Sequence, residues 1–404
     1  MGGCFDASSA NEGLLAEEMH LARLYRGNGR MTMRFLGFLL AVGLCIFFIV
    51  QKRFRRWNKA GLILASFVLM VVMAWRLLFP LLPPPQPTGT HDVVTEVAFY
   101  HYQTERSEMA TSGDTREIPV RVWRPKDAQA QHHPLFLYSP GSFGAEEANE
   151  TLFLELASRG YVVVGLNHPY HSFRSTLSDG RKIRVDSAFI KSVMRSQGSK
   201  DLPKTLAELR AWSNVRIDDI NAVLDQVLDS QTGHHHEQCI DRKRIVLSGH
   251  SLGGSAALAV GRQRPEDVQA LVILEAPFAS DIIGIDEDRY VFTDEWYPVP
   301  VLHIYSDALY ARLDEITTYE MNVRLMKSGR PMYVNKHISG VGHFGLTDMS
   351  LATPVLTYLL DGGLNTRPAP DALHELNGYV LEFLNAYNKE KCVVLPQNDN
   401  HSSF

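Results

Sequence analysis

Two long apolar runs near the N-terminus constrain this chain most, because only a lipid bilayer or a protein core can cover them. Residues 35–50 read FLGFLLAVGLCIFFIV, and residues 60–79 read AGLILASFVLMVVMAWRLLF with one charge, Arg76. At about 1.5 Å per residue the second run crosses the roughly 30 Å hydrocarbon core of a bilayer, whereas the first is short and needs its flanks. We therefore expect two transmembrane helices within residues 35–79, after an N-terminal tail at residues 1–34.

The charges around these runs favour one orientation. The loop at residues 51–59, QKRFRRWNK, is strongly basic, and no Lys or Arg lies between Arg76 and Arg106. Because basic loops stay in the cytoplasm, we expect everything after the second run to be extracytoplasmic. Arginines before the first run favour the opposite arrangement: Arg23, Arg26, Arg30 and Arg34. A cleaved signal peptide would explain the first run alone, but not two runs in tandem.

A proline-rich stretch separates the apolar runs from the rest of the chain. Residues 80–91 read PLLPPPQPTGTH, a composition that favours extended polyproline conformation and therefore a stiff linker. We expect one folded domain at residues 92–390, followed by a C-terminal tail at residues 391–404. The 404-residue chain is long enough for one large domain or two ordinary ones.

Short runs rich in Val, Ile and Leu alternate with helical patterns in the expected domain. The strand-like runs lie at residues 118–125, 133–141, 161–169, 244–249, 270–276, 299–307 and 332–340. The clearest helical stretches lie at residues 146–159, 204–228 and 372–387. This alternation predicts an α/β fold, with a mostly parallel central sheet covered by helices on both faces.

Charge and cysteine content exclude several functional classes. A formal charge of −5 without a long basic run argues against nucleic acid as the main partner. The four cysteines lack the spacing of metal ligands. Cys239 and Cys392 are the pair that could form a disulfide within the domain, although two isolated buried thiols are the commoner arrangement. Residues 234–236 are three consecutive histidines, which fit a solvated loop better than a metal site.

The stretch RIVLSGHSLGGSAALAV, residues 244–260, predicts a catalytic serine. The pattern Gly-x-Ser-x-Gly is common by itself, but here it follows a buried strand and opens a helix. That context is the one in which a serine projects from a strained turn at the top of a sheet. The alternative is a phosphate-binding turn, but the lysine and spacing of a P-loop are absent. We therefore interpret Ser251 as a nucleophile.

A serine nucleophile needs a histidine base and a carboxylate that orients the base. His343 fits the base, because it follows the last predicted strand in a glycine-flanked loop, SGVGHFGLTD. His303 and His337 sit within strand-like runs and are expected to be packed side chains. Two carboxylates lie between the serine and the base in chain order, as the motif requires. Glu275 and Asp307 each end a predicted strand, and position alone does not separate them.

The oxyanion of an acyl-transfer intermediate needs two backbone N–H donors. Leu252, directly after the serine, is expected to supply one. The loop YSPGSFGAEE is the best candidate for the other, with Ser142 or Phe143 as the donor, since Gly141 and Gly144 permit unusual dihedral angles. Neither a metal nor a cofactor is required by this chemistry, and we expect neither.

Four segments together resemble the platelet-activating-factor acetylhydrolases, which are related to lipoprotein-associated phospholipase A2. These segments are residues 135–172, 244–260, 270–278 and 339–353. The resemblance covers about residues 92–390 and implies an α/β-hydrolase fold that acts on phospholipids with short or oxidised acyl chains, without calcium. The membrane segment is unmatched.

The resemblance also implies roles for individual residues. The acid of this family follows the strand after the serine turn, which favours Glu275 over Asp307, although the family generally has Asp there. The matching oxyanion donor is Ser142, where Pro140-Gly141 replaces the usual His-Gly of the family. Asp348 matches a family position and is expected to support the histidine loop.

We therefore expect a membrane-anchored serine carboxylic ester hydrolase, acting through an acyl-enzyme on lipid or small esters. The polar segment at residues 172–201 is expected to form a lid or entrance. Rival activities on the same fold are those of a thioesterase, a peptidase or an acyltransferase. A rival from another class is a membrane binding protein that keeps the hydrolase scaffold without catalysis.

Overall fold

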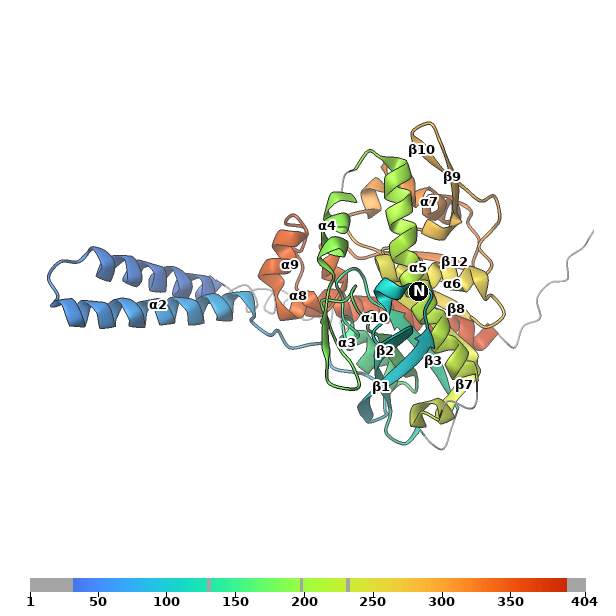
Figure 1. Ribbon diagram of the computed structural model, residues 1–404, viewed down its shortest axis with the longest axis horizontal. Helices are drawn as coiled ribbons and strands as arrows, with labels where there is room; N and C mark the ends of the chain where they lie inside the picture. Colours follow the sequence, from blue (N-terminus) through green and yellow to red (C-terminus); the bar gives the residue numbers. More distant parts are fainter. Residues whose placement is uncertain (1–31, 129–131, 197–198, 230–232, 391–404) are drawn as a thin grey trace, which may run out of the picture.

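The computed structural model describes residues 32–128, 132–196, 199–229 and 233–390. Two apolar helices come first, Thr32–Val50 and α2 (Arg56–Leu78), and both are long and apolar enough to cross a membrane. They take in the flanks of the predicted runs, so the first run gains the length that it lacked alone. In Figure 1 the two helices lie side by side and project away from the rest of the molecule. By length and composition they are candidate membrane spans.

The linker after α2 contains no helix or strand up to β1. It is nevertheless held against the domain by several hydrogen bonds. The N–H of Leu82 donates to the carbonyl of Leu351 at 3.1 Å, and the N–H and hydroxyl of Thr88 donate to the Glu155 carboxylate at 2.7 and 2.6 Å. The two apolar helices therefore join the domain beside its helices α8 (Met349–Ala352) and α9 (Pro354–Leu360) (Figure 1).

An eight-stranded sheet forms the centre of the domain, in the order β1-β2-β4-β3-β7-β8-β11-β12. Its strands are β1 (Val93–Gln103), β2 (Thr115–Pro125), β3 (His133–Ser139), β4 (Val162–Leu166), β7 (Ile240–His250), β8 (Ala270–Leu274), β11 (Val301–Tyr305) and β12 (Tyr333–His337). The pairs from β4 to β12 are parallel, and only β1–β2 and β2–β4 are antiparallel. The predicted mostly parallel sheet is confirmed.

Helices cover both faces of this sheet, as the alternation predicted. Residues of α5 and α6 pack on one face in the larger hydrophobic cluster, and residues of α3 and α10 pack on the other. The helices of the domain are α3 (Glu150–Ser158), α4 (Ser187–Ser196), α5 (Leu202–Leu228), α6 (Leu252–Gln263), α7 (Glu320–Lys327), α8 (Met349–Ala352), α9 (Pro354–Leu360) and α10 (Ala369–Glu390). Because β3 to β11 are buried on both faces, their sequences are continuous apolar runs rather than alternating ones.

Some elements differ from the sequence prediction. Strand β1 was not expected, because as an edge strand it is only half buried and mixes polar with apolar residues. Two small hairpins lie outside the central sheet: β5 (Arg174–Thr176) with β6 (Lys182–Arg184), and β9 (Ile282–Asp286) with β10 (Arg289–Phe292). The first hairpin and α4 form the segment that was expected to be a lid.

Candidate active site

Ser251 is the single residue between β7 and α6, and its backbone is strained. Its φ of 53° and ψ of −125° lie outside the regions that non-glycine residues usually occupy. Its N–H donates to the carbonyl of Leu274 at 2.9 Å, and its carbonyl accepts from the N–H of Ser255 at 3.0 Å. The turn therefore places this side chain at the carboxyl end of the sheet, with part of it exposed.

Two glycines around the serine are required by close packing of backbone. A Cβ on Gly253 would lie 2.1 Å from the carbonyl oxygen of Ser139, and one on Gly249 would lie 2.5 Å from the backbone of Gly253. No side chain fits at these distances, so strand, turn and helix approach each other closely only because these positions are glycine. This packing holds Ser251 in its strained conformation.

Glu275 and His343, the predicted acid and base, are in direct contact. The Nδ1 of His343 donates to Oε2 of Glu275 at 2.6 Å. Glu275 directly follows β8 in a left-handed conformation with φ 48°, and its side chain is fully buried. His343 lies at the loop after β12, with 26% of its side chain exposed. A buried carboxylate thus holds Nδ1 of a histidine whose other edge is accessible, as a catalytic base requires.

The second carboxylate oxygen of Glu275 is satisfied by a neighbouring strand. Oε1 accepts from the N–H and the hydroxyl of Ser306 at 2.8 and 2.7 Å. Ser306 directly follows β11, so the ends of two adjacent strands fix the acid. Buried carboxylates are tolerated when their oxygens accept such hydrogen bonds. Oε2, which faces His343, also accepts from the Ser306 hydroxyl at 2.9 Å, so Glu275 is held through both of its oxygens.

Asp307, the alternative acid, lies elsewhere. Its carboxylate accepts from Nε2 of His337 at 2.7 Å and from the N–H of Gly340 at 2.7 Å. It does not contact His343 and instead ties the end of β12 to the loop that carries the base. His337 and His303 are both engaged in packing or hydrogen bonds within the sheet region, as expected.

Among the described residues, no hydrogen bond joins Ser251 to His343, but the residue before Ser251 contacts His343. The ring of His250, the residue before Ser251, lies 4.4 Å from the ring of His343. Its Nε2 donates to the carbonyl of His343 at 3.1 Å. The hydroxyl of Ser251 has no hydrogen-bond partner among the described residues. Because catalytic contacts are often loose without substrate, this geometry is compatible with a serine–histidine pair that closes on binding.

The loop after β3, which was predicted to carry the second oxyanion donor, lies beside the serine turn. A Cβ added to Gly141 would lie 3.2 Å from Cβ of Ser251, so this loop contacts the serine turn directly. The N–H of Phe143 already donates to the carbonyl of His171 at 3.1 Å. By contrast, the N–H groups of Ser142 and Leu252 have no acceptor among the described residues. Ser142 is therefore the available donor of this loop, and Phe143 is not.

Helix α4 covers these two oxyanion elements. Its side chains Phe189 and Val193 form a buried cluster with Leu252, and Phe143 and Trp212 pack against that cluster. The rings of Phe143 and Phe189 are 5.4 Å apart. The segment that was expected to be a lid therefore places an apolar and aromatic wall over the candidate oxyanion site.

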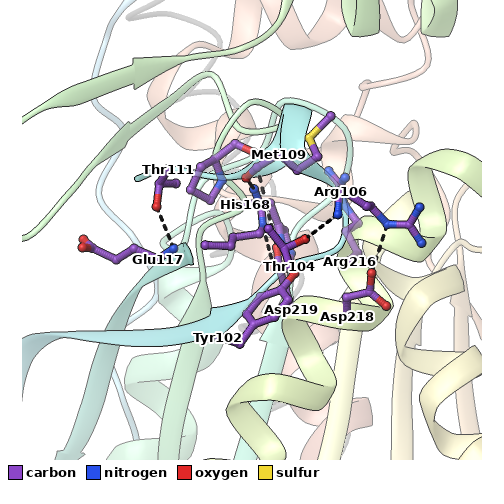
Figure 2. Close-up of polar contacts among 12 residues, drawn as sticks. Tyr102, Thr104, Arg106, Met109, Thr111, Glu117, His168, Arg216, Asp218 and Asp219 are labelled. Atoms are coloured by element: carbon purple, nitrogen blue, oxygen red, sulfur yellow. Dashed lines mark hydrogen bonds and ion pairs between the residues drawn. The ribbon is translucent and has the colours of Figure 1, made fainter. Parts of the chain in front are cut away.

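A Ser–His–Asp constellation, separate from Ser251, His343 and Glu275, lies in the interior. The hydroxyl of Ser139 contacts Nε2 of His168 at 2.9 Å, and Nδ1 of His168 donates to Asp219 at 2.8 Å. All three side chains are buried, and Figure 2 shows His168 beside Asp219. Arg116 holds the Asp219 carboxylate with two hydrogen bonds. Burial lowers the pKa of His168 to about 4, so this imidazole is neutral. With no exposed serine, this constellation supports the fold rather than catalysis.

Several residues of the site had no local sequence signal. The N–H groups of Phe344 and Gly345 donate to the Asp361 carboxylate at 3.0 and 3.1 Å, and that of Gly342 donates to Asn365 at 2.9 Å. These two side chains hold the loop on both sides of His343 from a turn after α9. Asp348 supports the same loop, as expected, by accepting from the N–H and hydroxyl of Thr151 in α3.

The remaining sequence candidates are structural. His236 is buried and bonds the hydroxyl of Tyr100 at 3.0 Å, so the predicted solvated histidine loop is wrong for this residue. Within the described ranges, no group of three His, Cys, Asp or Glu side chains is arranged to hold a metal ion. Cys239 is a free thiol that donates to the carbonyl of His236, and Cys392 lies outside the described residues.

Comparisons with known proteins bear on the fold and the family. No family model matches the chain. A probable 1-alkyl-2-acetylglycerophosphocholine esterase from Arthroderma benhamiae is 27% identical over 135 residues, which are 33% of this chain and 29% of that protein. The chain therefore matches less than a third of the length of this relative. The predicted resemblance to the platelet-activating-factor acetylhydrolases is confirmed in this matched part.

A solved structure supports the architecture. A ferulic acid esterase from Streptomyces cinnamoneus superposes with a TM-score of 0.56 at 20% identity, over 79% of this chain and 96% of that one. At this identity the likeness concerns the fold alone. Together with the strand order, it confirms the α/β-hydrolase fold.

Proposed function

We propose that the protein is a membrane-anchored serine ester hydrolase whose catalytic residues are Ser251, His343 and Glu275. The observation that carries this proposal is the 2.6 Å contact between His343 and the buried Glu275, beside a serine in a strained strand-to-helix turn. Strain at such a turn is characteristic of a nucleophile. The esterase named among the sequence relatives supports ester hydrolysis as the reaction class.

Each residue has a defined role in the proposed reaction. The hydroxyl of Ser251 attacks the ester carbonyl while Nε2 of His343 accepts its proton, and Glu275 stabilises the resulting imidazolium. The N–H groups of Leu252 and Ser142 bind the oxyanion of the tetrahedral intermediate. His343 then gives the proton to the leaving alcohol. Water activated by the same histidine hydrolyses the acyl-enzyme and restores the serine.

The proposed substrates are lipid esters with short acyl chains. The apolar wall of Phe143, Phe189 and Leu252 lies over the proposed oxyanion donors. The space between this wall and the donors favours a short apolar acyl group. The name of the Arthroderma relative, an esterase of 1-alkyl-2-acetylglycerophosphocholine, supports the same class. A bilayer anchor would keep the enzyme beside such lipids. No metal or cofactor takes part in this proposal.

For the anchor, the proposal places the loop at residues 51–59 in the cytoplasm and the hydrolase domain outside. The basic character of this loop supports that orientation. A reporter that is active only outside the cytoplasm, fused after Phe404, should be active. Activity from a reporter that works only in the cytoplasm, fused at the same position, would show that the hydrolase domain is cytoplasmic.

The enzyme proposal is tested on the full chain in detergent micelles. A fluorophosphonate probe should label the protein, and p-nitrophenyl esters of increasing chain length should be hydrolysed with a preference for short acyl groups. Ser251→Ala should abolish both signals, whereas Ser255→Ala, on the next turn of α6, should leave labelling in place. Absent labelling, or labelling that survives in Ser251→Ala, would refute the serine mechanism.

A further inference from the structure

The peptide between Gly141 and Ser142 is held from behind. The C=O of Gly141 and the N–H of Ser142 belong to one planar trans peptide, so they point in opposite directions. The carbonyl accepts from Nη2 of Arg216 at 3.2 Å and from the N–H of Gly144 at 3.0 Å. Fixing this carbonyl therefore also fixes the direction of the Ser142 N–H, which is the proposed oxyanion donor.

Arg216 is a costly residue in this position. It projects from α5, its side chain is fully buried, and among the described residues it forms no ion pair with a carboxylate. Both oxygens of a neighbouring carboxylate, Asp219, are taken by Arg116. Nη1 of Arg216 instead donates to Nδ1 of His171 at 2.5 Å, and Nε of Arg216 has no partner among the described residues. Burial lowers the pKa of Arg216 to about 9.

A buried cation without a carboxylate partner destabilises a fold unless another role retains it. His171 cannot supply the missing charge, because burial and the neighbouring guanidinium lower its pKa to about 2 and keep it neutral. His171 also stacks on Phe189 of α4 with 3.9 Å between ring centroids. The guanidinium thus connects the covering helix to the back of the oxyanion peptide.

We infer that Arg216 is a positioning residue of the oxyanion site, which orients the Ser142 N–H through the Gly141 carbonyl and places a positive charge behind that peptide. This inference rests on the proposed ester hydrolase function. An N–H held in this way is preorganised, so it binds the developing oxyanion without reorientation at the moment of reaction. The added charge polarises the peptide in the direction that strengthens its N–H as a donor.

The inference predicts a selective loss of transition-state binding. In the full chain in detergent, Arg216→Met should lower kcat for p-nitrophenyl acetate about 10²- to 10³-fold with little change in KM. When the serine oxygen adds to the carbonyl carbon of a trifluoromethyl ketone, the serine proton passes to His343 and the ketone oxygen becomes an oxyanion. Its inhibition constant should rise by the same factor as kcat falls. Arg216→Lys, which keeps a charge and a donor, should recover at least part of both losses.

A matched control separates positioning from general stability. Arg262 is another partly buried arginine, paired with Asp281 away from the oxyanion loop. Arg262→Met should lower the unfolding midpoint but leave kcat and ketone inhibition unchanged. Arg216→Gln serves as a second neutral variant, with the same expected loss as Arg216→Met.

Three results would overturn the inference. The first is wild-type kcat and ketone inhibition in either folded neutral variant of Arg216. The second is a parallel rise of KM and the inhibition constant, which would indicate a general binding defect. The third is failure of both neutral variants to fold, which would make Arg216 a residue of the fold. Failure of the proposed function itself is distinct, because the wild-type chain would then show neither hydrolysis nor fluorophosphonate labelling.

Discussion

The Nε2 of His250 donates a hydrogen bond to the backbone carbonyl of His343 at 3.1 Å, and the two rings lie 4.4 Å apart. The residue before the proposed nucleophile therefore anchors the loop of the proposed base. Burial lowers the pKa of His250 well below its usual value, so its imidazole is neutral. Since a carbonyl only accepts, the proton of this imidazole lies on Nε2.

Removing this anchor should impair catalysis without removing a group that touches substrate. His250→Phe keeps an aromatic ring beside His343 but loses the donor, so we expect kcat to fall roughly 10- to 100-fold as the base becomes less well placed. His250→Gln, which keeps an N–H donor of similar reach, should retain more activity. Steady-state kinetics on p-nitrophenyl acetate measure both. Equal activity in His250→Phe and the wild type would show that the hydrogen bond is dispensable.

The acid is distinguished by paired substitutions of carboxylates. Glu275→Gln replaces the acceptor of the His343 Nδ1–H and favours the wrong tautomer, so kcat should fall by up to about 10⁴-fold. Asp307→Asn disturbs contacts to His337 and Gly340 instead, and should lower the unfolding midpoint more than kcat. Turnover and thermal unfolding of both variants decide the matter. A larger loss of kcat in Asp307→Asn would identify Asp307, at the end of the adjacent strand, as the acid instead of Glu275.

Two serines occupy Ser–His–acid constellations, and labelling should tell them apart. Ser139 is better placed for hydrogen bonding, with its hydroxyl 2.9 Å from His168, but it is buried. Ser251 has no such contact but is partly exposed at the serine turn. We expect Ser139→Ala to retain fluorophosphonate labelling and Ser251→Ala to lose it. Mass mapping of the labelled peptide in the wild type provides an independent check, and a label on Ser139 would refute this assignment.

The fold and the proposed triad were predictable because their signals are local. Buried parallel strands are continuous apolar runs, and a serine turn needs glycines at fixed spacing, so Ser251 could be recognised within a short stretch of sequence. For the acid, the residues alone left Glu275 and Asp307 as alternatives, and only the family resemblance favoured Glu275. Strand β1 escaped prediction because it lies at an edge, where only two of its eleven residues are buried and the apolar pattern is weak.

The supporting residues could not be predicted, because their contacts join distant parts of the chain. Arg216 donates to the carbonyl of Gly141, which lies 75 residues earlier in the chain. Asp361 accepts from the N–H of Phe344 in the His343 loop, from a turn that follows α9. In sequence, Arg216 is one basic residue on a long amphipathic helix, and its natural interpretation is a solvated side chain. Only the tertiary structure shows that it is buried against the oxyanion loop.

Buried histidines predict a loss of stability at mildly acidic pH. Five fully packed histidines have a pKa lowered chiefly by burial: His168 and His236 to about 4, His303 to about 3, His171 to about 2, and His250 well below its usual value. Each is neutral in the folded state but binds a proton in the unfolded state below about pH 6.5. The unfolded state therefore binds more protons, and stability falls as pH decreases from about 6.5 toward 4.

Buried carboxyls whose pKa is raised oppose this trend, and Asp348 does so most clearly. Burial raises the pKa of Asp348 to about 7, so between about pH 4 and 7 the folded state holds a proton that the unfolded state has released. The stability contribution of Asp348 therefore increases as pH falls through this window, and it offsets one of the five histidines. Each remaining proton costs about 1.4 kcal/mol per pH unit, so the net slope still favours unfolding in acid.

Urea unfolding of the full chain in detergent, followed by tryptophan fluorescence at pH 7 and pH 5, measures this slope. We expect a clearly lower midpoint at pH 5. His303→Phe, which removes one titrating group from a site of stacked aromatic rings, should reduce the difference between the two midpoints. Asp348→Asn should enlarge it, because the opposing proton is lost. A midpoint that is equal at both pH values would show that these histidines are already protonated, or reach solvent, in the folded protein.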